Sequence, residues 1–384
     1  MTRIALVPSS YLPALGGVEE LTRHLARTLR EAGDEVEVWT GTSDDRDPPS
    51  RQVLDGITVR RFPLPLPAAR PGPLTRSGPG ALRALRALGR AVDEFRPQVL
   101  HVQCFGPNGA YAAALGAWRR LPVVVTLQGE TVMDDADIFE RSTVLRASLR
   151  SALRHAAVVT ACSAFTLADA EDRFGLAAGR GRVVFNGVDL AAPPAGRWRR
   201  APAAPYVLAV GRVVEKKGFD LLLAAYAAVS PAARTADLVV AGDGAERERL
   251  GALATSLGIA DRVHFPGRLD RDDVAAAMAG AELFVMPSRL EPFGIVVLEA
   301  WRAGVAVLAT GRGGPPEFVT DGVDGVLVDP TDPSRFAELL AGLLADPARR
   351  ARLAAAGRAR VEDFAWQVIA GRYRECYRDA LARA

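Results

Sequence analysis

Short apolar runs alternate with stretches of helical period along the whole chain, and this alternation restricts the fold more than any other feature. In the first half such runs lie at Ile4–Val7, Val36–Thr40, Val99–Val102, Val123–Leu127, Ala157–Thr160 and Val183–Phe185. In the second half they recur at Tyr206–Val210, Leu238–Ala241, Val263–Phe265, Leu283–Met286, Val305–Ala309 and Gly325–Val328. Six strands with intervening helices, repeated once, are typical of parallel sheets covered on both faces. The pattern predicts an α/β protein with two Rossmann-like, doubly wound domains.

A stretch rich in Pro and Ala, residues 191–205, separates the two halves and has no regular period. We expect it to be a linker between an N-terminal domain, residues 1–190, and a C-terminal domain, residues 206–362. Residues 363–384 have helical composition and no following strand. They must therefore pack on a domain that is already formed.

Charge and cysteine content narrow the class of protein. The chain has 48 Lys and Arg against 45 Asp and Glu, a formal net charge of +3, which does not indicate nucleic-acid binding. Its three cysteines lie far apart and have no metal-ligand spacing, as expected in a reducing cytoplasm. We find no signal peptide and no apolar run of about 20 residues. The sequence predicts a cytoplasmic protein.

The charge is unevenly distributed within the first half. Residues 56–92 contain seven arginines and no acidic residue. Such a stretch either contacts an anionic acceptor or an anionic membrane surface, or forms a solvated arginine face. Membrane contact would place the protein peripherally on the inner membrane face.

In each half, one loop follows the first strand, at the position where doubly wound folds bind ligands. Gly16-Gly17 either allows phosphate or sugar to approach the backbone or forms a tight turn. The loop lacks the G-x-G-x-x-G pattern, which disfavours a nicotinamide oxidoreductase. In the second half, Arg212 and Lys217 lie within Gly211–Gly218, where two cations could hold a diphosphate and stabilise its charge as it leaves.

The segment Arg289–Ala300 carries two carboxylates, Glu291 and Glu299. Pro292 is expected to begin a helix, and Gly294 would let backbone amides approach a ligand. The carboxylates would then be about 12 Å apart, with Glu299 about two turns inside the helix. A nucleotide-sugar could place its hexose hydroxyls at Glu291 and its ribose at Glu299. A structural ion pair is the alternative for Glu299.

Together these motifs resemble the large family of retaining GT-B glycosyltransferases, which includes mannosyl-, glucosyl- and N-acetylglucosaminyltransferases. The resemblance covers almost the whole chain and rests on Glu291-x7-Glu299, Gly211–Gly218, Gly16-Gly17 and Asn186–Asp189. It implies two domains facing across a cleft, with the acceptor held by residues 1–190 and the nucleotide-sugar mainly by residues 206–362. The helix of residues 363–384 would return to the N-terminal domain. It also implies transfer of a hexosyl group from a UDP-, GDP- or other nucleoside-diphosphate sugar to an acceptor hydroxyl, with retention of configuration and without metal or other cofactor. The acceptor, which the sequence does not name, would belong to a glycolipid, a polysaccharide or a natural-product precursor.

The resemblance also assigns roles to individual residues. The implied catalytic residues are Arg212, Lys217 and Glu291. The implied donor-binding residues are Gly16, Gly17, Arg268, Leu269, Phe293, Gly294, Ile295 and Glu299. The family commonly has T-x-H-G after the fourth strand, whereas this chain has Gln128, which can donate a hydrogen bond but cannot exchange a proton near neutral pH. Gln128 is therefore expected to contact sugar only, and His101 is a candidate acceptor contact.

The role of one acidic segment remains open, and so do two other functions. Asp134-Asp135-Ala136-Asp137, followed by Glu140, is either a metal-binding motif, an acceptor-facing loop or solvated surface. A metal is disfavoured because cations and helix N-termini would already meet the diphosphate charge. A nucleotide-sugar epimerase and a non-catalytic nucleotide-sugar-binding protein would have the same architecture.

Overall fold

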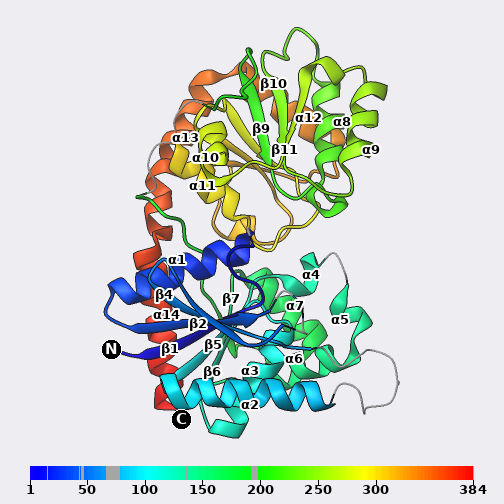
Figure 1. Cartoon of the computed structure of the whole chain (residues 1–384). Coiled ribbons are helices and arrows are strands. Elements are labelled where there is room, and N and C mark those ends of the chain that lie inside the picture. Colours follow the sequence, from blue (N-terminus) through cyan, green and yellow to red (C-terminus); the bar gives the residue numbers. More distant parts are fainter. Residues whose placement is uncertain are drawn as a thin grey trace. The chain divides into compact units, whose positions relative to one another are not determined.

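The computed structural model describes residues 1–14, 16–42, 44, 47–65, 78–134, 137–191 and 198–383. Contacts divide the chain into two units, each with its own sheet and helices (Figure 1). Unit 1 comprises Met1–Asn186 together with Trp366–Ala384, and unit 2 comprises Gly187–Ala365. The described part of residues 187–205 therefore belongs to unit 2. There Trp198 is 3% exposed and packs edge-on against Tyr206, with ring centroids 5.8 Å apart.

Unit 1 contains an eight-stranded sheet in the order β3-β4-β2-β1-β5-β6-β7-β8. Its strands are β1 Arg3–Pro8, β2 Glu35–Gly41, β3 Ser50–Leu54, β4 Ile57–Phe62, β5 Val99–Gln103, β6 Val123–Leu127, β7 Val158–Ala161 and β8 Gly181–Val183. All neighbouring strands pair in parallel except β3 and β4. The direction in which the strands are added reverses between β1 and β5.

The antiparallel hairpin β3–β4 corrects the prediction of six parallel strands in the first half. Its turn consists of Asp55 and Gly56, whose φ angles are 50° and 75°. Two consecutive positive φ values are typical of a two-residue hairpin turn, and Asp-Gly is a strong signal for one. Strand β3 is polar and largely exposed, so it has no apolar run by which the pattern could reveal it.

Helices cover both faces of the unit 1 sheet (Figure 1). They are α1 Gly17–Glu31, α2 Gly78–Phe95, α3 Pro107–Arg119, α4 Glu130–Met133, α5 Ile138–Arg141, α6 Thr143–His155, α7 Ala164–Phe174 and α14 Trp366–Ala382. Helix α1 buries Leu21, Leu25 and Leu29 on one face, as its helical spacing requires. Helix α14 packs against α1, β5, β6 and β7, so the end of the chain completes unit 1.

Unit 2 contains a six-stranded parallel sheet in the order β11-β10-β9-β12-β13-β14. Its strands are β9 Tyr206–Val210, β10 Asp237–Ala241, β11 Val263–Gly267, β12 Leu283–Met286, β13 Val307–Thr310 and β14 Val326–Val328. Its helices are α8 Phe219–Ala228, α9 Arg247–Ser256, α10 Arg271–Ala279, α11 Ile295–Ala303, α12 Pro333–Ala345 and α13 Pro347–Arg360. This is the doubly wound order, with its reversal between β9 and β12. The loops after these two strands contain the predicted catalytic residues.

Candidate active site

Two loops of unit 2 are joined backbone to backbone at the carboxyl end of the sheet. The loop after β9 contains a short 3-10 helix, Glu215–Lys217, and the loop after β12 runs through residues 287–294. The amide of Arg289 donates to the carbonyl of Lys216 at 3.0 Å. Gly218 has φ +66°, and a Cβ there would lie 2.1 Å from the carbonyl oxygen of Pro287. Glycine is needed here because any side chain would separate the loops.

This junction brings together two of the three predicted catalytic residues. The ammonium of Lys217 lies 2.7 Å from Oε2 of Glu291, and the hydroxyl of Ser288 donates to the same oxygen at 2.8 Å. Glu291 is 6% exposed, so its charge is largely removed from water. Its backbone is held as well, because its amide donates to the carbonyl of Arg312 and its carbonyl accepts from the amide of Gly314. A carboxylate and a cation are thus fixed at one point of the loop edge.

Helix α11 begins at Ile295, three residues after the predicted start at Pro292. Gly294 precedes it with φ 92°, and a Cβ there would lie 2.7 Å from the terminal methyl of Met286. Glu299 is therefore the fifth residue of the helix, little more than one turn inside, and the 12 Å separation derived from a continuous helix does not apply. The first amides of a helix have no carbonyl partner one turn before them, which favours an anion at this end. In α11 the amide of Val297 donates back to the carbonyl of Gly294 at 2.9 Å.

The remaining predicted donor residues of unit 2 differ in burial. Phe293 is 3% exposed and stacks on Phe318, with centroids 4.7 Å apart, so its side chain is part of the core. Glu299 is half-buried on α11. Arg212, after β9, and Arg268, after β11, are exposed, whereas Leu269 is 8% exposed.

Arg289 is a residue that sequence reasoning missed. Its guanidinium forms two 2.7 Å hydrogen bonds with the carboxylate of Asp220 on α8, and it donates to the carbonyl of Glu215 at 2.9 Å. Burial raises the pKa of Asp220, but the paired guanidinium more than offsets this, and the pKa lies below its ordinary value. Arg289 thus ties the loop of Glu291 to the loop of Lys217. No sequence motif indicates this role, because the partners are 69 residues apart.

In unit 1, the predicted glycine pair lies at the start of α1. Gly16 is extended, with φ −175°, and a Cβ there would lie 2.6 Å from a carboxylate oxygen of Glu19. Gly17 is the first residue of α1, and a Cβ there would have no described neighbour within 4 Å. The backbone at Gly17 is therefore open to a ligand on the side where a side chain would project.

Gln128 lies after β6 and is held at three points. Its amide Nε2 donates to Oε1 of Gln103 at 3.1 Å, and its Oε1 accepts from Nδ2 of Asn186 at 3.0 Å. Its backbone N–H donates to Oε2 of Glu130 at 2.6 Å. Glu130 also accepts from the amide of Phe105, and burial raises its pKa to about 7.

The family of the chain follows from comparison with known proteins. Residues 15–192 match the family Glycosyltransferase Family 4, and residues 197–360 match the family Glycosyl transferases group 1. The D-inositol 3-phosphate glycosyltransferase of Salinispora arenicola is 33% identical to this chain, over 96% of this chain and 88% of the relative. The chain belongs to the GT-B glycosyltransferases.

Solved structures of other proteins have the same fold as this glycosyltransferase. Sucrose-phosphate synthase from Thermosynechococcus elongatus superimposes with a TM-score of 0.80 and 26% identity, over 100% of both chains. HepE of Anabaena, in complex with UDP and glucose, superimposes with a TM-score of 0.75 and 22% identity, over 98% of this chain and 99% of that one. The predicted fold of two Rossmann-like domains is confirmed.

His101 of the glycosyltransferase is enclosed in unit 1. It is 0% exposed, its Nδ1 lies 2.7 Å from the hydroxyl of Tyr377, and its Nε2 lies 2.7 Å from that of Thr126. Burial lowers its pKa to about 3, which keeps the ring neutral. An acceptor could touch this ring only if α14 or the strand ends moved, so we assign it no acceptor contact.

Asp134, Asp137 and Glu140 line one side of a pocket of about 220 Å³ beside α4 and α5, and Arg173 of α7 also lines it. Asp134 accepts from the backbone amide of Ile138, and Glu140 pairs with Arg146 at 2.8 Å. Asp135 and Ala136 lie outside the described residues. Among the residues that are described, no group of three or more His, Cys, Asp and Glu is placed to hold a metal ion.

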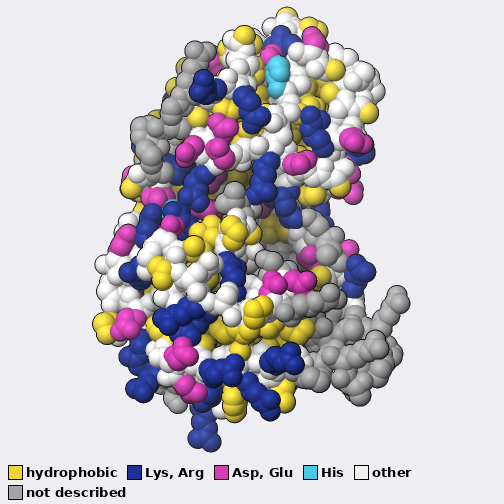
Figure 2. All heavy atoms as spheres, in the orientation of Figure 1, with side chains coloured by type: hydrophobic (Ala, Val, Ile, Leu, Met, Phe, Trp, Pro, Cys, Tyr) yellow, Lys and Arg dark blue, Asp and Glu magenta, His cyan; other side chains and the backbone are white. Residues whose placement is uncertain are grey.

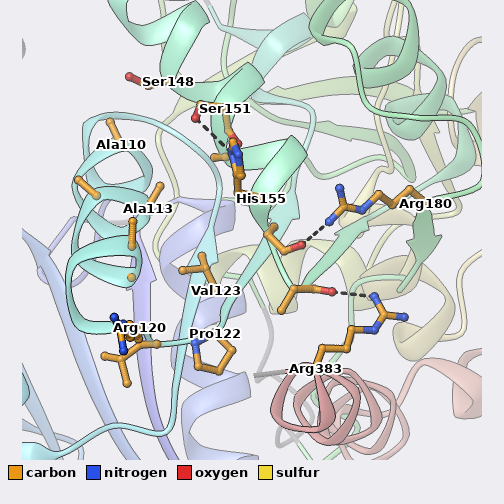
Figure 3. Close-up of a pocket in the computed structure, with 17 residues that line it drawn as sticks. Ala110, Ala113, Arg120, Pro122, Val123, Ser148, Ser151, His155, Arg180 and Arg383 are labelled. Carbon is orange, nitrogen blue, oxygen red and sulfur yellow. Dashed lines mark hydrogen bonds between the residues drawn. The ribbon is translucent and has the colours of Figure 1, made fainter.

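A larger groove, of about 910 Å³, lies at the opposite edge of the unit 1 sheet, between α3 and α6 (Figure 3). Arg180 donates to the carbonyl of Ala156 at 2.6 Å, and Arg383 donates to that of Ala157 at 2.9 Å. These arginines satisfy carbonyls just beyond the end of α6. The groove lies at the amino ends of β6 and β7, away from every predicted site residue of unit 1.

Proposed function

We propose that this glycosyltransferase moves a hexosyl group from a nucleoside-diphosphate sugar to an acceptor hydroxyl, with retention of anomeric configuration and without a metal. The pairing of Lys217 with Glu291, beside the N-terminus of α11, is the observation that carries the proposal. A nucleotide donor is also supported by HepE, which holds UDP on the same fold.

In the proposed reaction, the bond between the anomeric carbon and the diphosphate oxygen breaks while the acceptor oxygen bonds to the same face of that carbon. The developing charge on the diphosphate is met by Arg212, by Lys217 and by the amides of residues 293–295. The leaving phosphate takes the proton of the acceptor hydroxyl. Glu291 orients the hexose hydroxyls, Glu299 the ribose, and Gln128 contacts the sugar or the acceptor.

Nucleoside diphosphates provide the direct test of this proposal. We expect one of UDP, GDP or ADP to raise the melting temperature, with a stabilisation of about 2.7 kcal/mol at a hundredfold excess over its dissociation constant. Glu299→Ala should remove most of this shift, whereas Glu338→Ala, at an exposed site on α12, should not. No shift with any nucleotide, or equal shifts in both variants, would contradict the site assignment.

Product analysis with the matching sugar donor separates the remaining functions. Transfer that a chelator does not diminish supports the metal-free reaction, and clear loss contradicts it. Conversion of the donor sugar without any acceptor would indicate an epimerase. Nucleotide binding without turnover would indicate a binding protein.

Part of the basic stretch in unit 1 forms an exposed face on α2. Arg60 does not belong to it, because it is 8% exposed and pairs with Glu37 at 2.8 Å. Arg70 and Arg76 lie outside the described residues. Arg83, Arg86 and Arg90 on α2 are exposed, and basic and hydrophobic side chains mingle on this part of unit 1 (Figure 2).

We propose that this face contacts an anionic membrane, so that the enzyme is peripheral on the inner membrane face. Leu82 on α2 is 49% exposed and Trp118 on α3 is 56% exposed, which adds apolar contact to the charge. No described helix is both long and apolar enough to cross a bilayer.

Vesicle binding tests the membrane contact. At about 1 kcal/mol per basic residue near the surface, the double variant Arg83→Glu/Arg86→Glu should bind vesicles of phosphatidylglycerol more than tenfold more weakly. The control is Arg352→Glu/Arg358→Glu on α13, which makes the same change of charge at exposed sites of unit 2. Equal binding by both variants would refute the proposed face.

A further inference from the structure

A chain of buried hydrogen bonds runs through unit 1 from the loop edge to the C-terminal helix. It leads from Asn186 to Gln128, from Gln128 to Gln103 at the end of β5, and from Gln103 to His101 on the same strand. It ends at Tyr377 of α14. Gln103 is 3% exposed, Asn186 is 6% exposed, and His101 and Tyr377 are at most 1% exposed.

The donor and acceptor atoms of these side chains determine which partner donates in each hydrogen bond of the series. An amide nitrogen can only donate, and Nε2 of Gln103 lies 3.2 Å from Nε2 of His101. That ring nitrogen must therefore accept. The neutral ring then carries its proton on Nδ1, from which it donates to the hydroxyl of Tyr377 at 2.7 Å. The hydroxyl of Thr126, 2.7 Å from Nε2, can donate to the same nitrogen. Its further hydroxyl partners are Thr160 at 2.6 Å and Tyr373, which also hydrogen-bonds to Gln103.

The same direction fixes both amides. Because Nε2 of Gln103 faces the histidine, its Oε1 faces Gln128 and accepts from Nε2 of that residue. Oε1 of Gln128 then faces Asn186. If the histidine carried its proton on Nε2 instead, Gln103 would have to turn over, and Gln128 with it. The orientation of the Gln128 amide is thus set, through Gln103, by which nitrogen of His101 carries the proton.

We propose that Gln103, His101 and Tyr377 are positioning residues, which hold the Gln128 amide so that its second N–H is presented to a sugar or acceptor hydroxyl. This rests on the proposed function, in which Gln128 makes that contact. Asn186 and Glu130 complete the support, since they bind the side-chain oxygen and the backbone N–H of Gln128. Helix α14 thereby contributes to the loop edge of unit 1 without reaching it.

The tautomer can be measured without any substrate. In protein labelled with ¹⁵N-histidine, long-range proton–nitrogen spectra distinguish the two neutral forms, and the signal lost in His101→Asn identifies the residue among the four histidines. We expect His101 to carry its proton on Nδ1 at pH 7. Tyr377→Phe removes the acceptor and should shift the ring towards the Nε2 tautomer. A wild-type ring protonated on Nε2 would overturn the proposal.

A double-mutant cycle tests whether Gln103 acts through Gln128. We expect Gln103→Leu to lower the rate of transfer about tenfold, as for loss of one oriented hydrogen bond of roughly 1.4 kcal/mol. Its affinity for the nucleoside diphosphate should not change. In the background of Gln128→Ala, the same substitution should have no further effect. The control is Gln367→Leu, at an exposed position of α14, which should leave both quantities unchanged.

Two results would refute the coupling. One is that the double variant loses transfer rate by the product of the factors for Gln103→Leu and Gln128→Ala. The other is that Gln103→Leu binds the nucleoside diphosphate more weakly than the wild type. If Gln103→Leu does not fold, Tyr377→Phe replaces it in the cycle. If the protein transfers no sugar, the proposed function fails, while the spectra still decide the tautomer. The two failures are therefore distinguishable.

Discussion

Lys217→Ala is expected to reduce transfer by about 10²–10³-fold, the largest loss among single substitutions of the charged residues at the loop edge. The ammonium of Lys217 is fixed 2.7 Å from Glu291, where it can meet the charge that develops on the leaving diphosphate. Lys216 and Lys217 are the only lysines in the sequence, which otherwise supplies its positive side chains as arginine. Of the two lysines, Lys217 is the one whose ammonium lies against the buried carboxylate of Glu291.

Steady-state transfer rates check this expectation, with Lys216→Ala as the control because it removes the same charge one residue away. Lys217→Ala also leaves the buried carboxylate of Glu291 without its cation, which lowers stability. The double variant Lys217→Ala/Glu291→Gln should restore stability but not activity. Restored activity would show that Lys217 serves only to neutralise Glu291.

Lysine acylation gives a second readout that is independent of turnover. An activated ester can label the N-terminus and the two lysines, and mass spectrometry resolves the sites. Saturating nucleoside diphosphate should protect Lys217 and leave the N-terminus as reactive as before. Equal labelling of Lys217 with and without nucleotide would contradict its contact with the diphosphate.

Apolar periodicity located every strand of unit 2 but not the hairpin of unit 1. Strands β9, β10 and β12 of unit 2 are buried on both faces, so each is an apolar run in the sequence. Strand β3 is an exposed edge strand with a polar sequence, and only the Asp55-Gly56 turn signals it. The prediction failed where burial, the cause of the pattern, is absent.

At the site, strand order predicted which loops share an edge but not which side chains meet. Lys217 and Glu291 are 74 residues apart, and their contact depends on the two loops joining backbone to backbone. The start of α11 was misplaced because Pro292 suits a helix start, whereas Gly294 has a φ of 92° that no helix contains. The role of His101 was also hidden, since its partner Tyr377 lies 276 residues away.

Gly218→Ala should be a strongly damaging substitution even though it adds only one methyl group. Its Cβ would lie 2.1 Å from the carbonyl oxygen of Pro287, so the loop of Lys217 must move away from the loop of Glu291. Positive φ adds strain of about 1 kcal/mol for any residue with a side chain. Together, strain and backbone collision should lower the free energy of unfolding by roughly 3 kcal/mol or more and abolish detectable nucleotide binding.

Gly258→Ala is the matched control, because Gly258 has the same φ of +66° and a Cβ there would have no described neighbour within 4 Å. It should cost only the backbone strain and leave nucleotide binding intact. Urea unfolding and nucleotide titration of both variants separate the two effects. If both variants lost similar stability and both still bound nucleotide, strain alone would explain Gly218, and close approach of the loops would not be what holds Lys217 against Glu291. A larger loss confined to Gly218→Ala would mean that the loop junction itself builds the site.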